Sequence, residues 1–248
     1  MWGTSSSTTR PSARRTASRS IPSRVALPDI RGYGASICRD PALHRWDRYV
    51  ADVIAIMTAL DTPSAHLIGA GLGGTIALRT CQSHPDKIRT AVIISAEAIE
   101  DDEAKAADTK LMDRFAERVR TEGLEAGWAL FLSHLQPLIA NLVAEALPRA
   151  DPESAAAAAS IGHDRAFSRV EALADISTPT LIIAGNDARH PADTAQIVAE
   201  ALANGVLAQV TMSDTLLNAE DMGRAFAPAI EEFLHGVTVA DRHGGARP

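Results

Sequence analysis

The sequence is poor in cysteine and in aromatic residues, and it contains no long apolar run. Its 248 residues include two cysteines, and aromatic side chains make up 4% of the chain. The two cysteines form neither a disulfide framework nor a Cys/His metal spacing, so we expect no metal site and a reducing, cytoplasmic setting. No segment approaches the roughly 18 consecutive apolar residues that a membrane-spanning helix needs. We therefore expect no membrane partner.

Acidic residues are absent from the first 24 positions, which are rich in Ser, Thr and Arg. Because five of the 24 Lys and Arg residues lie in this arm, residues 25–248 carry 19 basic and 31 acidic residues, a net charge of −12. Such a body repels nucleic acid, so we expect no nucleic-acid partner. The arm has too few large apolar side chains to fold, which predicts disorder at 1–24. A transit peptide and a phosphate-binding arm are the alternatives.

Short apolar runs alternate with helical periodicity along the rest of the chain. The runs predict strands at 25–30, 65–69, 90–95, 179–185 and 206–212, and the periodic segments predict helices at 41–60, 73–84, 191–203 and 220–234. This alternation is typical of βαβ units with parallel strands. Residues 98–175 have a mostly helical pattern that interrupts the alternation. We expect an α/β core at 25–97 and 176–236, a helical lid at 98–175, and a loose tail at 237–248.

A dense group of glycines lies between the second predicted strand and the following helix, in the segment Leu67-Ile-Gly-Ala-Gly-Leu-Gly-Gly74. One interpretation is a dinucleotide-binding turn, because glycines at a helix N-terminus can cradle a phosphate. The segment matches that pattern only in part, and no acidic residue follows at the distance of a ribose contact. The other interpretation is the G-x-S-x-G elbow, a strained turn that lifts a nucleophile to the top of the sheet beside backbone N–H groups.

The motifs that flank this turn favour the elbow, since in their order along the chain they resemble the α/β-hydrolase superfamily. They are Asp29-Ile-Arg-Gly-Tyr-Gly-Ala-Ser36, His84-Pro-Asp-Lys-Ile-Arg89 and Pro179-Thr-Leu-Ile-Ile-Ala-Gly-Asn-Asp187. The resemblance covers roughly residues 25–234 and is strongest to small hydrolases of lactones, esters and C–C bonds. It implies a mostly parallel, doubly wound sheet with a helical lid and no cofactor.

The resemblance also implies a catalytic triad, and two of its three positions are substituted here. Gly71 stands at the position of the nucleophile, and Thr215 stands where the family has its catalytic histidine. Asp187 matches the acid position with a one-residue departure in spacing. His190 lies beside Asp187 and is a candidate base. Without the family's nucleophile and histidine, the usual Ser-His-Asp route is closed.

Four further residues are candidates for binding a ligand. Glu97 directly follows the third predicted strand, at the carboxyl end where α/β proteins bind ligands. Leu72 follows Gly71 at the glycine-rich turn, and Asp214 precedes Thr215. Trp128 belongs to the predicted lid, where aromatic side chains either form a core or line a pocket.

The family's oxyanion motif follows an early strand, and this sequence has the Ser/Thr/Arg arm in that place. The resemblance therefore implies an N-terminally incomplete sheet, in which either 25–30 pairs differently or one edge stays open. An open edge favours self-association. We also hypothesise that residues 1–24 are a mis-started or frame-altered segment.

Two functional hypotheses remain open. The first is a small-molecule-binding pseudoenzyme, or a lyase- or cyclase-like enzyme that uses pocket acids such as Asp187, Asp214 or Glu97. The second is a hydrolase of esters, lactones or C–C bonds that activates water with an unusual base such as His190 or His163. Either would take a small apolar or carbonyl-containing molecule. A dinucleotide-binding domain is the remaining alternative.

Overall fold

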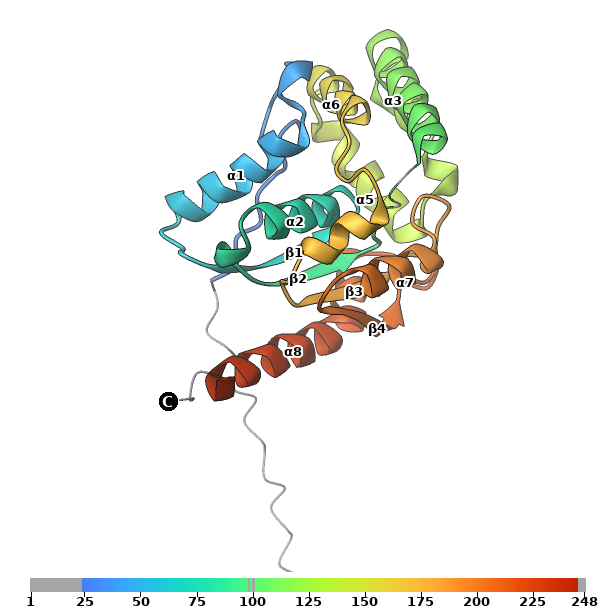
Figure 1. Ribbon diagram of the computed structural model, residues 1–248. Helices are drawn as coiled ribbons and strands as arrows, with labels where there is room; N and C mark the ends of the chain where they lie inside the picture. Colours follow the sequence, from blue (N-terminus) through green and yellow to red (C-terminus); the bar gives the residue numbers. More distant parts are fainter. Residues whose placement is uncertain (1–23, 98, 100, 245–248) are drawn as a thin grey trace, which may run out of the picture.

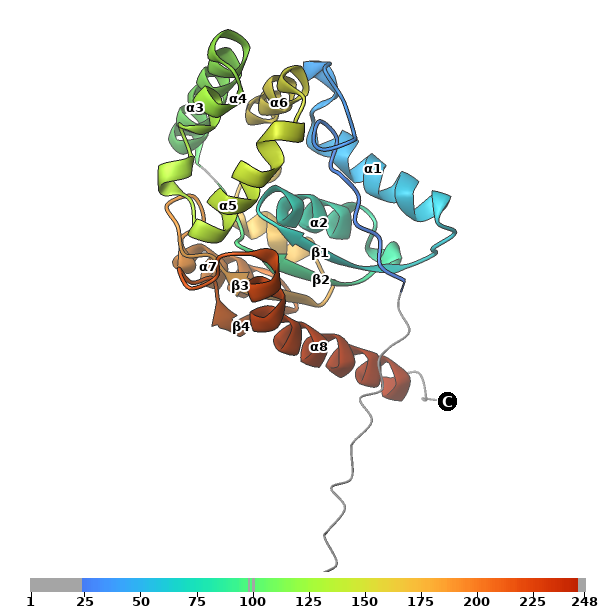
Figure 2. The same cartoon turned by 180° about the vertical axis from the view of Figure 1, so that it is seen from behind.

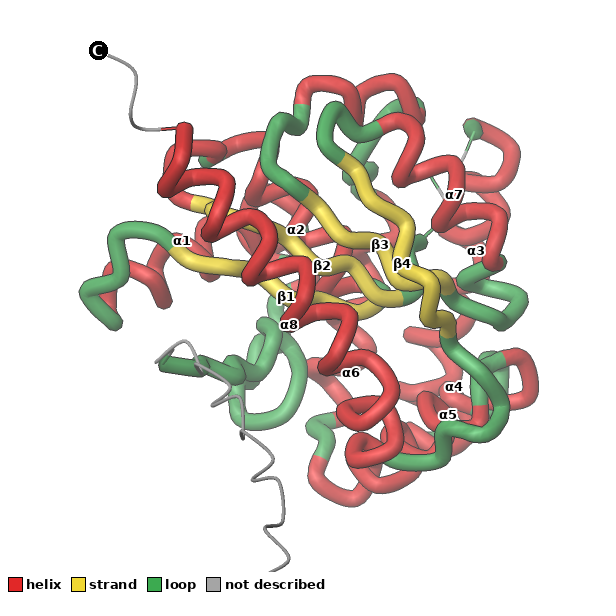
Figure 3. Tube along the Cα trace, turned by 90° about the horizontal axis from the view of Figure 1, so that it is seen from below, coloured by secondary structure: helices red, strands yellow, loops and turns green. Residues whose placement is uncertain are grey.

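The computed structural model describes residues 24–97, 99 and 101–244, whose four strands form one parallel sheet (Figure 1). The strands lie in the order β1 (Ala65–Ala70), β2 (Ile88–Ile94), β3 (Thr180–Ala184) and β4 (Gly205–Thr211). Each neighbouring pair is parallel, and Val92 of β2 lies between Ile68 of β1 and Leu181 of β3. Figure 3 shows this order from below, with one long helix crossing the sheet.

Helices cover both faces of the sheet, which confirms the doubly wound α/β class. On one face, Ile93 and Ile182 pack against α1 (Trp46–Ala59), α2 (Leu72–Ser83) and α7 (Ala192–Ala201). On the other face, Val92 and Leu181 pack against α5 (Pro137–Ala146) and α8 (Ala219–Gly244). Successive residues of a strand point to opposite faces, so the continuous apolar runs fill both layers. Full burial of each such side chain stabilises the fold by about 1.5–3 kcal/mol.

The segment between β2 and β3 is helical and lies over the end of the sheet where the strands terminate (Figure 2). It includes α3 (Asp102–Glu122), α4 (Leu124–Trp128), α5 and α6 (Pro152–Ala158). Trp128 packs edge-on against Phe115 and Phe131, with ring centroids 5.5 and 5.9 Å away. These aromatic rings form a separate core within the helical segment. That the segment acts as a lid stays a prediction.

Short 3-10 helices connect the longer elements of the described chain. Two of them precede or follow helices of the α/β core, and four lie in the segment between β2 and β3. Their bounds are η1 (Pro41–Leu43), η2 (Pro85–Lys87), η3 (Leu132–His134), η4 (Leu147–Arg149), η5 (Ala159–His163) and η6 (Val170–Asp175). The single helix predicted for 41–60 is thus η1 followed by α1.

The predicted strand at 25–30 is wrong. This run is not part of the sheet, and Val25 and Leu27 are 75% and 92% exposed. A strand needs a neighbour for its backbone groups, and Pro28 also lacks the N–H that a sheet ladder requires. β1 is consequently an edge strand, with Ile68 55% exposed. Self-association through this edge stays a prediction, which light scattering at micromolar concentration would test.

The loose tail predicted at 237–248 is also wrong in part, because α8 continues to Gly244. Gly236 lies inside this helix, since one glycine in a long helix costs only about 1 kcal/mol. The predicted arm at 1–24 lies outside the described residues apart from Arg24, whose guanidinium donates to the Leu60 carbonyl.

Candidate functional site

The glycine-rich turn has the backbone of a nucleophile elbow. Gly71 joins β1 to α2 with φ 49° and ψ −119°, and its N–H donates to the Ile94 carbonyl at 3.0 Å. A Cβ at Gly69 would overlap the Gly73 carbonyl, and a Cβ at Gly74 would lie 2.8 Å from the Ile93 side chain. These two glycines are therefore required by the close packing of α2 on the sheet. The first N–H groups of α2 have no partner within the helix and remain available to a ligand.

Asp187 and His190 form a hydrogen-bonded pair in the loop after β3. His190 Nδ1 lies 2.9 Å from Asp187 Oδ1, and the side chains are 13% and 6% exposed. The same oxygen accepts the backbone N–H groups of Arg189 at 3.0 Å and of His190 at 2.9 Å. In the tautomer in which Nδ1 carries the hydrogen, Nδ1 donates to the Asp187 carboxylate. In that tautomer Nε2 carries a lone pair and can act as a base.

His190 also reaches the elbow. A Cβ built on Gly71 would lie 3.4 Å from His190 Nε2. A side chain at position 71 would therefore project next to the basic nitrogen of the pair. The structure thus brings Asp187, His190 and Gly71 together, in the order acid, base and nucleophile position. The nucleophile position itself has no side chain.

The helical segment holds the loop of the pair from above. The buried Gln136 donates its side-chain amide to the Asn186 carbonyl at 2.5 Å, and its backbone N–H lies 3.4 Å from Asp187 Oδ2. Arg189 pairs with Asp108 of α3 at 3.2 Å. Its guanidinium carbon also lies 5.2 Å from the centroid of the Phe131 ring. Sequence reasoning missed Gln136 and Arg189, and only the proximity of Arg189 to Asp187 in the chain gave any signal for them.

The loop after β4 carries no base. Thr215 and Asp214 are exposed, and the Thr215 hydroxyl lies 2.7 Å from the hydroxyl of Ser213 in its own loop. Among the described residues, neither Thr215 nor Asp214 forms a hydrogen bond or an ion pair with Gly71 or with the Asp187–His190 pair. The histidine that stands close to the elbow comes from the loop after β3 instead.

Glu97 lines a cavity of about 60 Å³ beside the elbow helix. Its carboxylate accepts a hydrogen bond of 2.7 Å from the hydroxyl of Thr75, one turn beyond Gly71 on α2. Lys105 and Arg165 from the helical segment contribute cationic side chains to the same cavity.

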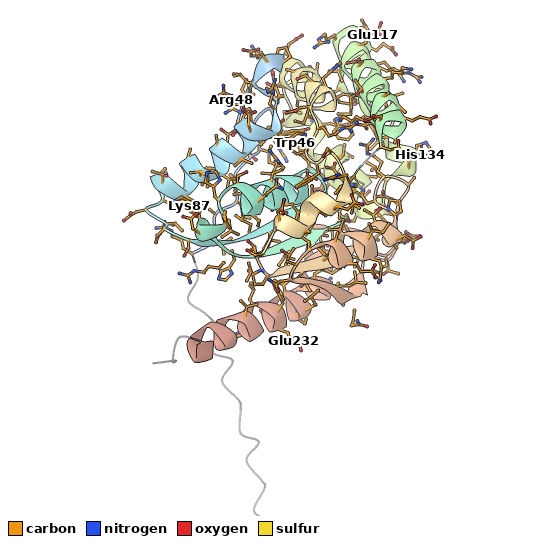
Figure 4. All side chains as sticks on the ribbon, in the orientation of Figure 1. Trp46, Arg48, Lys87, Glu117, His134 and Glu232 are labelled. Carbon is orange, nitrogen blue, oxygen red and sulfur yellow. The ribbon has the colours of Figure 1, made fainter. Side chains whose placement is uncertain are left out.

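The other histidines considered as bases lie elsewhere. His163 is 56% exposed and pairs with Asp113 on the surface of α3, with 2.6 Å between Nε2 and Oδ1. His134 is exposed on the helical segment, where Figure 4 labels it. His66 bonds to Thr90 on the neighbouring strand at 2.7 Å. Of the described histidines, His190 is the one that meets the requirements of the site.

Leu72 and Trp128 take different positions relative to the elbow. Leu72 opens α2 directly after Gly71, so its N–H is among those at the helix start, while its side chain packs beside Trp46 and Ile76. Trp128 belongs to the aromatic core of the helical segment.

Within the described ranges, no group of three or more His, Cys, Asp and Glu could hold a metal ion. In the same ranges, no helix is both long and apolar enough to cross a membrane.

The chain is similar in sequence to several curated hydrolases. A 2-hydroxymuconate semialdehyde hydrolase from Pseudomonas sp. (strain CF600) is 32% identical over 76 residues, which cover 31% of this chain and 27% of that protein. The match thus spans little more than a quarter of that relative. The protein named "Putative carbamate hydrolase RutD" from Variovorax paradoxus (strain S110) is 30% identical over 188 residues, covering 72% of this chain and 69% of the relative.

Solved structures share the fold at lower identity. A thermophilic esterase from Thermogutta terrifontis has a TM-score of 0.70 and 24% identity, covering 85% of this chain and 79% of the esterase. An enol-lactonase from Burkholderia xenovorans LB400 has a TM-score of 0.67 and 20% identity, covering 84% and 79%. The family model described as "Alpha/beta hydrolase family" matches residues 2–229. This match overturns the alternative of a dinucleotide-binding domain. The chain belongs to the alpha/beta hydrolase family.

Proposed function

We propose that this chain hydrolyses a small ester, lactone or carbamate without a covalent intermediate, by using His190 and Asp187 to activate a water molecule at the glycine elbow. The observation that carries the proposal is the 3.4 Å between His190 Nε2 and the Cβ position of residue 71, combined with the bond from Nδ1 to Asp187. Since Gly71 has no side chain, a water molecule can occupy the space that a nucleophile would fill. Relatives named as hydrolases favour this reaction class.

The proposed reaction needs one proton shuttle. His190 Nε2 takes a proton from the water as its oxygen attacks the carbonyl carbon, and Asp187 stabilises the resulting imidazolium. The tetrahedral oxyanion forms near the N–H groups at the start of α2, beginning with Leu72. Collapse of this intermediate breaks the bond to the leaving group, which receives the proton from His190. An ester gives an acid and an alcohol, and a lactone gives a single hydroxy acid. A carbamate ester gives an alcohol and a carbamic acid, which then breaks down to an amine and carbon dioxide.

Turnover of p-nitrophenyl acetate tests the proposal. We expect steady hydrolysis above the buffer rate, without an initial burst and without labelling by a fluorophosphonate, because no serine is acylated. His190→Gln should lower kcat about 100-fold, within the usual range for removal of a general base. His163→Gln is the matched control, since His163 also pairs with an aspartate but lies on the surface. It should leave turnover unchanged.

Three outcomes would contradict the proposal. Absence of wild-type turnover would favour the small-molecule-binding pseudoenzyme, which the missing nucleophile also supports. A burst with fluorophosphonate labelling would indicate an acyl-enzyme on a residue other than Gly71. Equal turnover of wild type and His190→Gln would assign the activity to another base. Soluble, correctly folded variants, checked by circular dichroism, are required for each comparison.

A further inference from the structure

Ser95 has a backbone conformation that serines rarely adopt. It directly follows β2 and has φ 53°, close to the 49° of Gly71 at the end of the neighbouring strand. Asp61, in the turn after α1, is the other non-glycine residue with positive φ in the described chain. This conformation is disfavoured for residues with a Cβ and persists where the surroundings enforce it. Glycine would fit the same backbone with less strain, so the serine side chain needs a reason.

Ser95 lies between the elbow and the Asp187–His190 pair. Its N–H donates to the Ile183 carbonyl of β3 at 2.9 Å, and the carbonyl of the preceding Ile94 accepts from Gly71 at 3.0 Å. The Cβ of His190 lies beside the end of β3, because a Cβ on Gly185 would be 2.6 Å from it. Its ring then reaches the Cβ position of Gly71 at the end of β1. The imidazole therefore crosses the end of β2, where Ser95 is fixed.

The Ser95 hydroxyl has no hydrogen-bond partner among the described residues, although the residue is only 6% exposed. A strained backbone and a buried hydroxyl without a partner among the described residues thus coincide at the end of β2, the strand between those that carry the elbow and the Asp187–His190 loop.

We propose that the Ser95 hydroxyl binds the water molecule that His190 deprotonates. This inference rests on the proposed function of the site. Water donates one hydrogen to His190 Nε2 and the other to Ser95 Oγ, which leaves an oxygen lone pair directed at the substrate carbonyl. Two fixed acceptors orient the attacking oxygen, and orientation of this kind lowers the entropic part of the barrier. No bond to Ser95 forms during the reaction.

Ser95→Gly separates this role from a structural one, because strain relief and loss of the hydroxyl act in opposite directions. We expect its melting temperature to rise by about 2–4 °C, since glycine relaxes a residue with positive φ. We expect kcat for p-nitrophenyl acetate to fall about 10-fold with little change in KM. The matched control is Asp61→Gly, which removes the same kind of strain far from the site. It should raise the melting temperature and leave kcat unchanged.

Ser95→Ala provides the second variant. It lacks the hydroxyl and keeps the strain, so it should lose kcat to the same extent without gaining stability. Wild-type kcat in Ser95→Gly would overturn this inference alone and leave the role of His190 in place. Fluorophosphonate labelling of Ser95 in the wild type would also overturn it, by making Ser95 a nucleophile. Absence of wild-type turnover would overturn the proposed function and this inference together.

Discussion

The loops that follow β3 and β4 begin at the same end of the sheet, where the strands terminate, yet they differ in burial and in chemistry. The loop after β3 holds Asp187 and His190 with side chains 6% and 13% exposed, and four hydrogen bonds converge on the Asp187 carboxylate. The loop after β4 exposes Asp214 and Thr215 to solvent. The family's histidine belongs to the second loop, and here a histidine from the first reaches the elbow.

This difference shows that a histidine from a neighbouring loop of the same fold can lie beside the elbow. The carboxyl ends of parallel strands lie side by side, so loops from neighbouring strands can reach the same point above the sheet. β3 lies closer to the elbow strand β1 than β4 does, because the order is β1-β2-β3-β4. A base from the β3 loop can therefore reach Gly71 without any rearrangement of the sheet.

The largest difference in kcat between the two loops is expected when the aspartate of each loop is neutralised. Asp187→Asn should lower kcat for p-nitrophenyl acetate about 100-fold or more, because an amide no longer selects the tautomer with a free Nε2 or stabilises the imidazolium. Asp214→Asn makes the same chemical change in the exposed loop and should have no effect on kcat. Similar losses in both variants would contradict the assignment of the active loop.

A smaller effect is expected from loosening the β3 loop. Arg189→Ala keeps the backbone N–H bond to Asp187 but removes the ion pair with Asp108 and the contact with Phe131. We expect a 3- to 10-fold loss of kcat and a loss of unfolding free energy of about 1 kcal/mol, as for a partly exposed ion pair with a cation–π contact. Steady-state kinetics and urea denaturation measure the two quantities.

Arg224→Ala is the matched control for Arg189, since Arg224 pairs with Glu220 and Asp221 at the start of α8, after the β4 loop. Turnover should be unaffected there. An equal loss of kcat in the Arg224 variant would mean that both loops contribute to the site.

The smallest expected effect concerns a histidine outside both loops, and it distinguishes stability from catalysis. His44 is 1% exposed and bonds to the Tyr49 hydroxyl at 2.9 Å and to the Cys38 carbonyl at 3.0 Å. Burial, assisted by the Arg31 charge, lowers the pKa of His44 below its value in the unfolded chain. The unfolded state therefore binds more protons as the pH falls below about 6.5, and stability decreases there.

Melting temperatures between pH 8 and pH 5 measure this dependence. The wild type should lose up to about 1 kcal/mol per pH unit below pH 6.5 from His44, and His44→Gln should lack this component while being less stable at pH 8. An identical pH dependence in both proteins would show that His44 is not its source.

Much of the fold could be predicted from the sequence, because buried parallel strands and amphipathic helices have local signatures. The runs at 65–69, 90–95, 179–185 and 206–212 correspond to β1 through β4 within one or two residues. The run at 25–30 has the same apolar character but no neighbouring strand, and the presence of a neighbour is a tertiary property.

The site was less predictable than the fold. Spacing identified Gly71 and Asp187, because elbows and strand ends have recognisable sequence patterns. That His190 faces Gly71 depends on the conformation of the loop after β3, which packs against Gln136 and α3. Ser95 has no signal in the sequence, since a serine after a strand is ordinary until its positive φ is known.

Fluorophosphonate labelling of Gly71→Ser tests most directly whether His190 is the base at the elbow. We expect that this single substitution yields a serine that is labelled rapidly. Adding His190→Gln should abolish the labelling, whereas adding Thr215→His should change it little. Labelling that requires Thr215→His, or that persists after His190→Gln, would contradict the account, because the base would then not be the histidine of the β3 loop.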